Sequence, residues 1–340
     1  MRTQLILLAT MVGLAPQICA QQGATPVVDI YASSKGEENV SHSTVIMRAM
    51  CDEAGNVYTR PFDPGKGLGE LRAPIQEITP EAKPAGRFPA DGKTFFVRDG
   101  NVYALAGPRD GLYIVKFDQN GSVKSRTKLD LPFFIDVLHL AVFKSGEYLV
   151  VGLTGTINDT GPHLRTPFTG VFTADGRLVK KIYEPEDEDA YQKAEGNDTK
   201  YHLCCSDSGN EFVGWWADVA SASDGNIYLL HGTSPPLVYV ISPAGDVVRK
   251  LRIDIRNPEL SANSIKAHDG RLAIGFSWLG DVPVSSIKVI DLRGNSIADY
   301  EVREATSASD PILACYNSGG FTLIPRQAGT KPYLLTAKLP

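Results

Sequence analysis

The chain has 340 residues, of which 43% are hydrophobic and 21% are charged, and its formal net charge at pH 7 is −5. Proteins that bind nucleic acids carry a basic face, so this charge balance argues against a nucleic-acid partner. Beyond residue 20, the sequence contains no apolar stretch of the length that a membrane span requires.

The first 20 residues have the pattern of a secretory signal peptide. Arg2 provides a positive charge, residues 5–14 form an apolar stretch too short to cross a bilayer, and Ile18-Cys19-Ala20 resembles a cleavage site. We therefore predict that residues 1–20 are removed. The remaining residues, 21–340, are expected to form one domain that is secreted or periplasmic.

A glycine-centred hairpin signature then returns about every 45 residues. Its glycines are Gly55, Gly100, Gly146, Gly225, Gly270 and Gly319, at successive spacings of 45, 46, 79, 45 and 49 residues. Glycine next to Asp or Asn, between alternating apolar residues, is typical of a tight β-hairpin turn. Recurrence at this period indicates repeated β-sheets.

A second glycine signature lies inside the repeats, at Gly121, Gly176, Gly245 and Gly294. Two hairpins per repeat make four strands, and radial repetition of such sheets protects most strand edges. We predict an all-β fold, a six-bladed β-propeller of four-stranded antiparallel blades. The blades are expected to begin near residues 43, 91, 136, 217, 263 and 310. The even double-hairpin period disfavours the alternative, a β-sandwich.

The last repeat ends too early to hold an outermost strand. Residues 26–32 form a β-like segment that precedes the first blade and belongs to none. An unpaired edge strand promotes aggregation. We therefore expect this N-terminal strand to complete the sixth blade and close the ring.

The 79-residue interval predicts an insertion at about residues 184–216, between blades three and four. It begins with an acidic run, residues 184–189, and ends with Trp215 and Trp216. Long loops in compact domains are functional or disordered. The acidic run is typical of a solvated face. The two indoles either pack over the end of the ring or form a stacking surface for a ligand.

Four cysteines remain after removal of the signal peptide. Cys51 and Cys315 each stand four residues before a repeat glycine, on the innermost strands of blades that adjoin in a closed ring. They form either a disulfide or two buried free thiols. Cys204 and Cys205 are adjacent and could bridge, pair elsewhere or bind a metal, but their spacing does not match a structural zinc site.

Polar residues recur where the innermost strands begin. They are Asp91, Asp136, Asp218, Asn263 and Asp310, and in a propeller they would surround one mouth of the central channel. Carboxylates gathered there repel one another unless a cation offsets them, so Asp136, Asp218 and Asp310 are candidate calcium ligands. The alternative is a local turn bond at each strand start. With Trp215 and Trp216, the mouth is a candidate ligand pocket.

The G-x-S-x-G nucleophile elbow, the H-E-x-x-H zinc motif and the P-loop do not occur in the sequence. The simplest function consistent with the repeats and the signal peptide is a non-enzymatic recognition scaffold without a cofactor. Its ligand, a protein or a small molecule, has no sequence signature.

The segments Ser223–Tyr228 and Val238–Val248 resemble an NHL-type repeat, and residues 26–340 resemble bacterial secreted six-bladed propellers. This resemblance implies an alternative function. The wider group includes divalent-metal-dependent hydrolases and lyases of the gluconolactonase and regucalcin type, which hold calcium or zinc on a Glu-Asn-Asp set. Asp218 and Asn263 have compatible side chains, although the surrounding sequence does not match.

Overall fold

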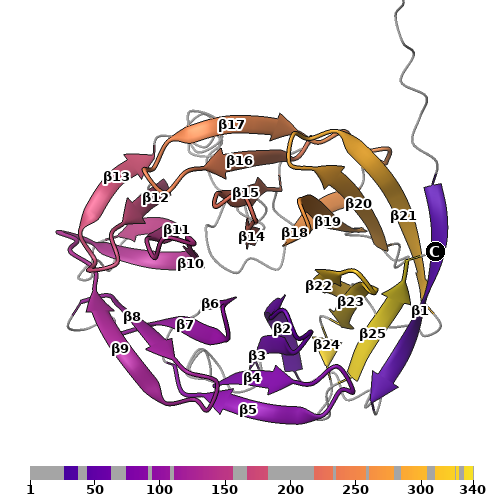
Figure 1. Ribbon diagram of the computed structural model, residues 1–340. Helices are drawn as coiled ribbons and strands as arrows, with labels where there is room; N and C mark the ends of the chain where they lie inside the picture. The colour runs from indigo at the N-terminus through magenta and orange to yellow at the C-terminus, as the bar shows by residue number, and fades with distance from the viewer. Residues whose placement is uncertain are drawn as a thin grey trace, which may run out of the picture.

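The computed structural model describes residues 27–36, 44–62, 74–90, 94–107, 111–155, 167–182, 218–232, 235–257, 260–278, 285–304, 311–325, 327–328 and 333–339. The regular elements in these ranges are β-strands arranged in sheets that radiate from a common centre, as in a β-propeller (Figure 1). No helix long and apolar enough to cross a membrane is found among the described residues.

Three sheets each contain four antiparallel strands in chain order. The first consists of β6 (Phe95–Arg98), β7 (Asn101–Ala106), β8 (Tyr113–Phe117) and β9 (Val123–Lys128). The second consists of β10 (Phe134–Val142), β11 (Tyr148–Gly155), β12 (Pro167–Phe172) and β13 (Leu178–Ile182). The third consists of β14 (Asp218–Ser221), β15 (Ile227–His231), β16 (Leu237–Ile241) and β17 (Val247–Arg252).

The remaining strands form two larger sheets. One contains β2 (Thr44–Cys51), β3 (Val57–Phe62), β4 (Ile75–Ile78) and β5 (Pro84–Phe88), with the short β24 (Gln327–Ala328) along β2. The other has the order β18-β19-β20-β21-β1-β25-β23-β22. Its strands are β18 (Leu260–His268), β19 (Arg271–Trp278), β20 (Ser285–Asp291), β21 (Ser296–Glu304), β1 (Val27–Gly36), β25 (Tyr333–Lys338), β23 (Gly320–Pro325) and β22 (Pro311–Asn317).

The first glycine signature forms the turn between the two innermost strands of a sheet. In the turn from β14 to β15, Gly225 has a φ of 85° and its amide donates to the Ala222 carbonyl at 3.2 Å. Asp224 accepts hydrogen bonds from the Asn226 amide at 3.0 Å and the Tyr228 hydroxyl at 2.9 Å. The Asp-Gly-Asn-x-Tyr pattern therefore holds this turn together through its own side chains.

The second glycine signature holds neighbouring sheets together. The Gly176 turn lies against β9 of the preceding sheet, where the Gly176 carbonyl accepts from the Asp130 amide at 2.9 Å. A Cβ on Gly176 would collide with the Lys128 carbonyl oxygen. Gly121 approaches the Arg87 carbonyl of the preceding sheet in the same way. Glycine is therefore required at these turns by close packing as well as by positive φ.

The core lies between the facing sheets. Tyr58 on β3 contacts Phe88 on β5 with ring centroids 5.8 Å apart, and Phe88 contacts Phe117 on β8 of the next sheet at 6.2 Å. Phe88 and Phe117 are fully buried. The inner strands thus supply apolar side chains to both faces of a sheet, because neighbouring sheets cover both faces there, whereas outermost strands such as β9 are largely exposed.

The N-terminal strand β1 has two partners. Residues 27–32 pair in parallel with β21, and residues 32–36 pair antiparallel with β25. The sequence predicted that residues 26–32 would complete the last sheet, whereas the pairing with β25 is made by residues 32–36, of which only Ala32 belongs to the predicted segment. The predicted segment instead covers the outer edge of β21, which would otherwise be exposed.

Cys51 at the end of β2 and Cys315 on β22 form a disulfide, with their Cα atoms 5.3 Å apart. Of the two alternatives that the sequence left open, a disulfide or two buried free thiols, the structure has the disulfide. The predicted signal peptide, the insertion at about residues 184–216, and Asp91, Cys204, Cys205, Trp215, Trp216 and Asp310 lie outside the described residues.

Gly176→Ala is expected to destabilise the protein much more than Gly225→Ala. Both glycines have positive φ, but an added Cβ meets no atom within 4 Å at position 225 and the Lys128 backbone at position 176. The difference in the free energy of unfolding should exceed about 1 kcal/mol, as measured by chemical denaturation. Equal losses would contradict the packing role of the second signature.

Ile30→Ala is expected to lower the free energy of unfolding by about 2–5 kcal/mol, because Ile30 packs β1 onto the apolar core. Its side chain is 4% exposed, whereas that of the adjacent Tyr31 is 74% exposed. Tyr31→Ala is the matched control and should change stability by less than about 0.5 kcal/mol. Equal losses of stability in both variants would contradict the packing role of the buried Ile30 side chain.

Candidate functional site

The structure describes the predicted site residues only in part. Asp218 is the first residue of β14 and its side chain is 3% exposed. Asn263 lies on β18, and Asp136 lies on β10, where its backbone but not its side chain is described. Asp310, Trp215 and Trp216 lie outside the described residues. The predicted site therefore reduces, in the described structure, to Asp218 and its surroundings.

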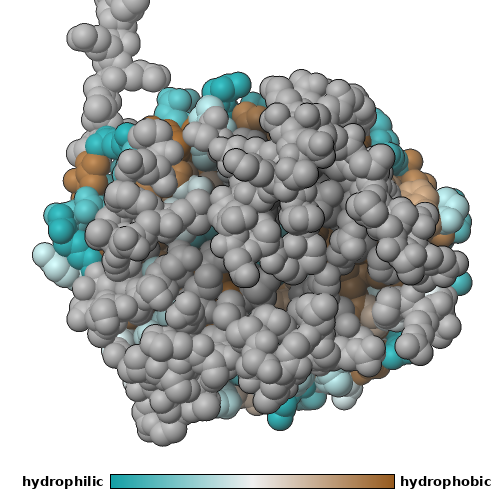
Figure 2. Space-filling model, turned by 180° about the vertical axis from the view of Figure 1, so that it is seen from behind, coloured by the Kyte–Doolittle hydropathy of each residue, from teal (hydrophilic) through white to brown (hydrophobic). Residues whose placement is uncertain are grey.

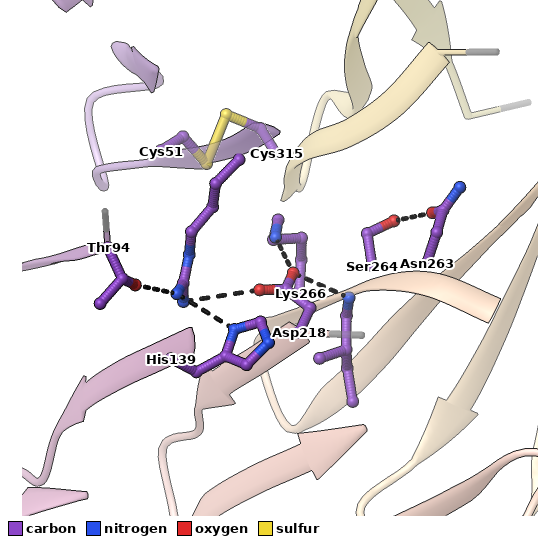
Figure 3. A network of polar contacts seen from close by, with 10 residues as sticks. Cys51, Thr94, His139, Asp218, Asn263, Ser264, Lys266 and Cys315 are labelled. Carbon is purple, nitrogen blue, oxygen red and sulfur yellow. Dashed lines mark hydrogen bonds and ion pairs between the residues drawn. A yellow bond between two sulfur atoms is a disulfide. The ribbon is translucent and has the colours of Figure 1, made fainter. Parts of the chain in front are cut away.

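Asp218 lies in a buried polar cluster at the centre of the molecule, which we call the axial cluster (Figure 3). Its members come from different sheets and meet where the innermost strands converge. They are Arg48 on β2, Thr94 directly before β6, His139 on β10, Asp218 on β14 and Lys266 on β18. All five are buried.

Asp218 is the only carboxylate among these five side chains, and its two oxygens have different surroundings. Oδ2 accepts hydrogen bonds from the Lys266 ammonium group and from the Ile265 backbone amide, the latter at 3.1 Å. Oδ1 lies 3.5 Å from Nη2 of Arg48 and has no hydrogen-bond partner among the described residues. Half of the carboxylate is therefore fully satisfied and half is not.

Arg48 bridges three sheets through one of its terminal nitrogens. Nη1 donates to Oγ1 of Thr94 at 2.6 Å and contacts Nδ1 of His139 at 3.2 Å. A guanidinium can only donate, so Nδ1 of His139 accepts and the neutral imidazole carries its proton on Nε2. Nε and Nη2 of Arg48 are buried and find no hydrogen-bond acceptor in the described part of the chain.

Bulges in the innermost strands redirect two of these side chains, those of Arg48 and His139. The pairing register shifts between Ile46 and Ala49 on β2 and between Val137 and His139 on β10. Similar shifts occur between Ala262 and Ser264 on β18 and between Leu313 and Cys315 on β22. A bulge bends the strand and redirects the side chains next to it. Arg48 and His139 lie at such places.

Sequence reasoning identified Asp218 but missed Arg48, Thr94, His139 and Lys266. Arg48, His139 and Asp218 each stand seven residues before their repeat glycine, as does Asn263. This shared offset was the available signal. Asp136 stands three residues before His139 on the same strand. The position equivalent to Asp218 in this repeat is therefore His139 and not Asp136.

Asn263 belongs to a neighbouring polar group. Its amide nitrogen donates to Oγ of Ser277 at 2.8 Å, and its carbonyl oxygen accepts from Oγ of Ser264 at 2.8 Å. These bonds are made within the β18–β19 hairpin. Asn263 therefore supports the inner hairpin, and its hydrogen bonds go to Ser264 and Ser277 and not to Asp218 (Figure 3).

Opposite charges determine the protonation state of the cluster. Burial opposes ionisation of Asp218, but the adjacent Lys266 and Arg48 charges outweigh it and lower the pKa of the carboxyl below its usual value. Burial lowers the pKa of Lys266, and Asp218 opposes this effect. At neutral pH the carboxylate is ionised.

The axial cluster does not fit a calcium ion. Calcium takes six to eight oxygen ligands, whereas the charged groups around Asp218 are the cations of Lys266 and Arg48. A divalent cation at Asp218 would be repelled by both. Among the described residues, no group of three or more His, Cys, Asp or Glu side chains is arranged to hold a metal ion.

A second hollow lies away from the centre, between β20, β21 and residues 254–257, with a volume of about 260 Å³. In this hollow Asp299 contacts Lys288 at 2.8 Å and Arg256 at 3.4 Å. Figure 2 shows the face opposite to that of Figure 1, where hydrophilic and hydrophobic described residues are both visible around the rim. The axial cluster is the stronger candidate site because its five side chains are all buried and come from five different sheets.

No protein-family model and no functionally curated protein matches the sequence. Among solved structures, a putative gluconolactonase is similar over 91% of this chain and 94% of its own, with a TM-score of 0.53 and 11% identity. Virginiamycin B lyase from Staphylococcus aureus has a TM-score of 0.49 at 10% identity, covering 91% of this chain and 100% of its own. The first of these similarities supports a β-propeller fold, and at this identity it supports nothing finer.

Asp218→Asn is expected to lower the free energy of unfolding at pH 7 by about 3–5 kcal/mol, because it leaves two buried cations unpaired. The pKa of Asp218 is lowered in the folded state. Its contribution is therefore complete above the unfolded pKa of about 3.9 and is lost as the pH falls through the folded pKa. Chemical denaturation at pH 7 and at pH 3 measures the free energy of unfolding of both proteins. The difference between wild type and Asp218→Asn should be smaller at pH 3.

Asp175→Asn is the control for this experiment. The pKa of Asp175 is also lowered, through hydrogen bonds with Thr173 and Arg177, but the residue is exposed. Solvent screens its interactions, so stability should change little. If Asp175→Asn lowered the free energy of unfolding as much as Asp218→Asn, the buried ion-pair explanation would be contradicted.

Proposed function

We propose that the protein is a secreted, non-enzymatic six-bladed β-propeller that binds a ligand at its axial cluster. The observation that carries this proposal is the convergence of Arg48, Thr94, His139, Asp218 and Lys266 from five successive inner hairpins. Buried polar groups that remain partly unsatisfied are rare in folded proteins and call for a partner.

The proposed blades are β2–β5, β6–β9, β10–β13, β14–β17, β18–β21, and the set β22, β23, β25 and β1. The antiparallel pairing of residues 32–36 with β25 supports β1 as the outermost strand of the sixth blade. The Cys51–Cys315 disulfide supports direct contact between the first and last blades. The likeness to NHL-type repeats rests on the sequence of the β14–β17 sheet.

The alternative function is a divalent-metal-dependent hydrolase or lyase. The fold similarity to a putative gluconolactonase is compatible with it. The residues at the axis favour binding, because Lys266 and Arg48 occupy the surroundings of Asp218 that a metal ion would need. Binding also agrees with the lack of catalytic motifs in the sequence.

A thermal-shift screen of a small-molecule library tests the proposed function. We expect some compounds to raise the Tm of the wild type and to lose this effect in Lys266→Met, because the ammonium group is part of the site. Lys288→Met is the matched control: Lys288 is also buried and ion-paired, but it lies in the second hollow. It should keep the compound-induced shifts.

Calcium chloride and EDTA provide the opposing test. We expect both to leave the Tm unchanged, since the axial charges repel a divalent cation. A calcium-induced rise in Tm that Lys266→Met alters, together with calcium-dependent lactone hydrolysis, would favour the hydrolase. A library in which no compound depends on Lys266 would overturn the axial cluster as a binding site.

A further inference from the structure

The charges of the axial cluster do not balance. Arg48 and Lys266 are cationic, and Asp218 is the only anionic side chain among its five members. Among these five side chains one positive charge is therefore left over, and an uncompensated charge in a buried place is costly. Because Lys266 and the Ile265 amide both bind Oδ2 of Asp218, the remaining positive charge is centred on the Arg48 guanidinium.

The free edge of Arg48 has the shape of an oxyanion site. Nη1 is used by Thr94 and His139, whereas Nε and Nη2 have no acceptor among the described residues. Nε and Nη2 present two parallel N–H groups on one edge of the planar guanidinium. This fork matches the two oxygens of a carboxylate, and such bidentate pairs are among the strongest charge-assisted hydrogen bonds.

A free acceptor lies beside this fork. Oδ1 of Asp218 is 3.5 Å from Nη2 of Arg48 and receives no hydrogen bond from the described residues. A carboxylate bound to the fork would place its α substituent near this oxygen. A hydrogen-bond donor at that position, such as a hydroxyl group, would satisfy Oδ1 and reduce repulsion between the two carboxylates.

We propose that the axial cluster binds a small organic monocarboxylate that carries a hydrogen-bond donor next to its carboxylate group. The carboxylate accepts from Nε and Nη2 of Arg48, and the donor contacts Oδ1 of Asp218. A single negative charge on the ligand balances the cluster. This inference rests on the proposed function, because it names the ligand class of the same site.

Acetate, glycolate, acetamide and chloride are the probes. Acetamide has the shape of acetate without its charge, glycolate adds one hydroxyl, and chloride adds charge without a planar fork. The signal of the Arg48 Nε–H group in side-chain ¹H–¹⁵N spectra, assigned with Arg48→Lys, reports binding directly. We expect glycolate to bind more tightly than acetate. Acetate should bind at least about tenfold more tightly than acetamide or chloride. The dissociation constants of the two carboxylates should lie in about the millimolar range.

Variants distinguish a failure of the carboxylate proposal from a failure of the proposed binding function. Arg48→Lys keeps the charge and loses the fork, so carboxylate binding, measured by calorimetry, should weaken at least about tenfold. Lys266→Met should also weaken it, whereas Lys288→Met should not. Acetate binding no tighter than acetamide or chloride binding would overturn the carboxylate proposal, and equal affinity for acetate and glycolate would overturn the role of Asp218. If the library screen still finds neutral ligands that depend on Lys266, the proposed function survives.

Discussion

The close approach of outer hairpin turns to the preceding sheet, at Gly121 and Gly176, is the constraint on which the rest of the structure depends. Gly121 and Gly176 lie so near the backbone of the neighbouring sheet that no side chain fits between them. The contact recurs along the chain and fixes the separation of neighbouring sheets at their outer edge. The innermost strands must then converge, and this convergence brings residues that are distant in sequence to one centre (Figure 1).

The centre formed in this way is polar, although the faces of the sheets are apolar. Arg48, His139 and Asp218 come from three different sheets, so their contacts exist only when those sheets are in place. Ionic groups in such a place cost desolvation free energy and are retained where they confer specificity or bind a partner. The uneven charge of the cluster favours binding, because a purely structural network would be expected to satisfy its own donors.

Much of the fold was predictable, because hairpin turns leave local signals. The repeat glycines located the hairpins of the β-propeller fold, since a positive φ favours glycine and a close backbone approach excludes a side chain. The pairing of β1 with β21 was not predictable, since a single amphipathic strand does not specify which edge it will cover. Register was the other difficulty. Asp136 precedes the position of His139 by three residues, and one bulge moves a side chain to another face.

The cluster was predictable only at Asp218. Arg48 and His139 share its offset from the repeat glycine, but their residue types differ, so no motif marks the set. Lys266 stands at another offset and reaches Asp218 from the adjacent sheet. The chemistry of the site is thus distributed over repeats that each contribute one unlike side chain. The cluster is therefore recognised by comparing equivalent positions between repeats and not by searching for a recurring residue type.

The Cys51–Cys315 disulfide changes what a break in the chain does. The bond joins residues separated by 264 positions, so most of the protein lies within one covalent loop. A protease that cuts once anywhere inside this loop leaves both products attached to each other. The nicked molecule keeps its facing sheets at high effective concentration and does not dissociate into fragments. In an oxidising environment outside the cell, this linkage makes a single cut in a surface loop a local event.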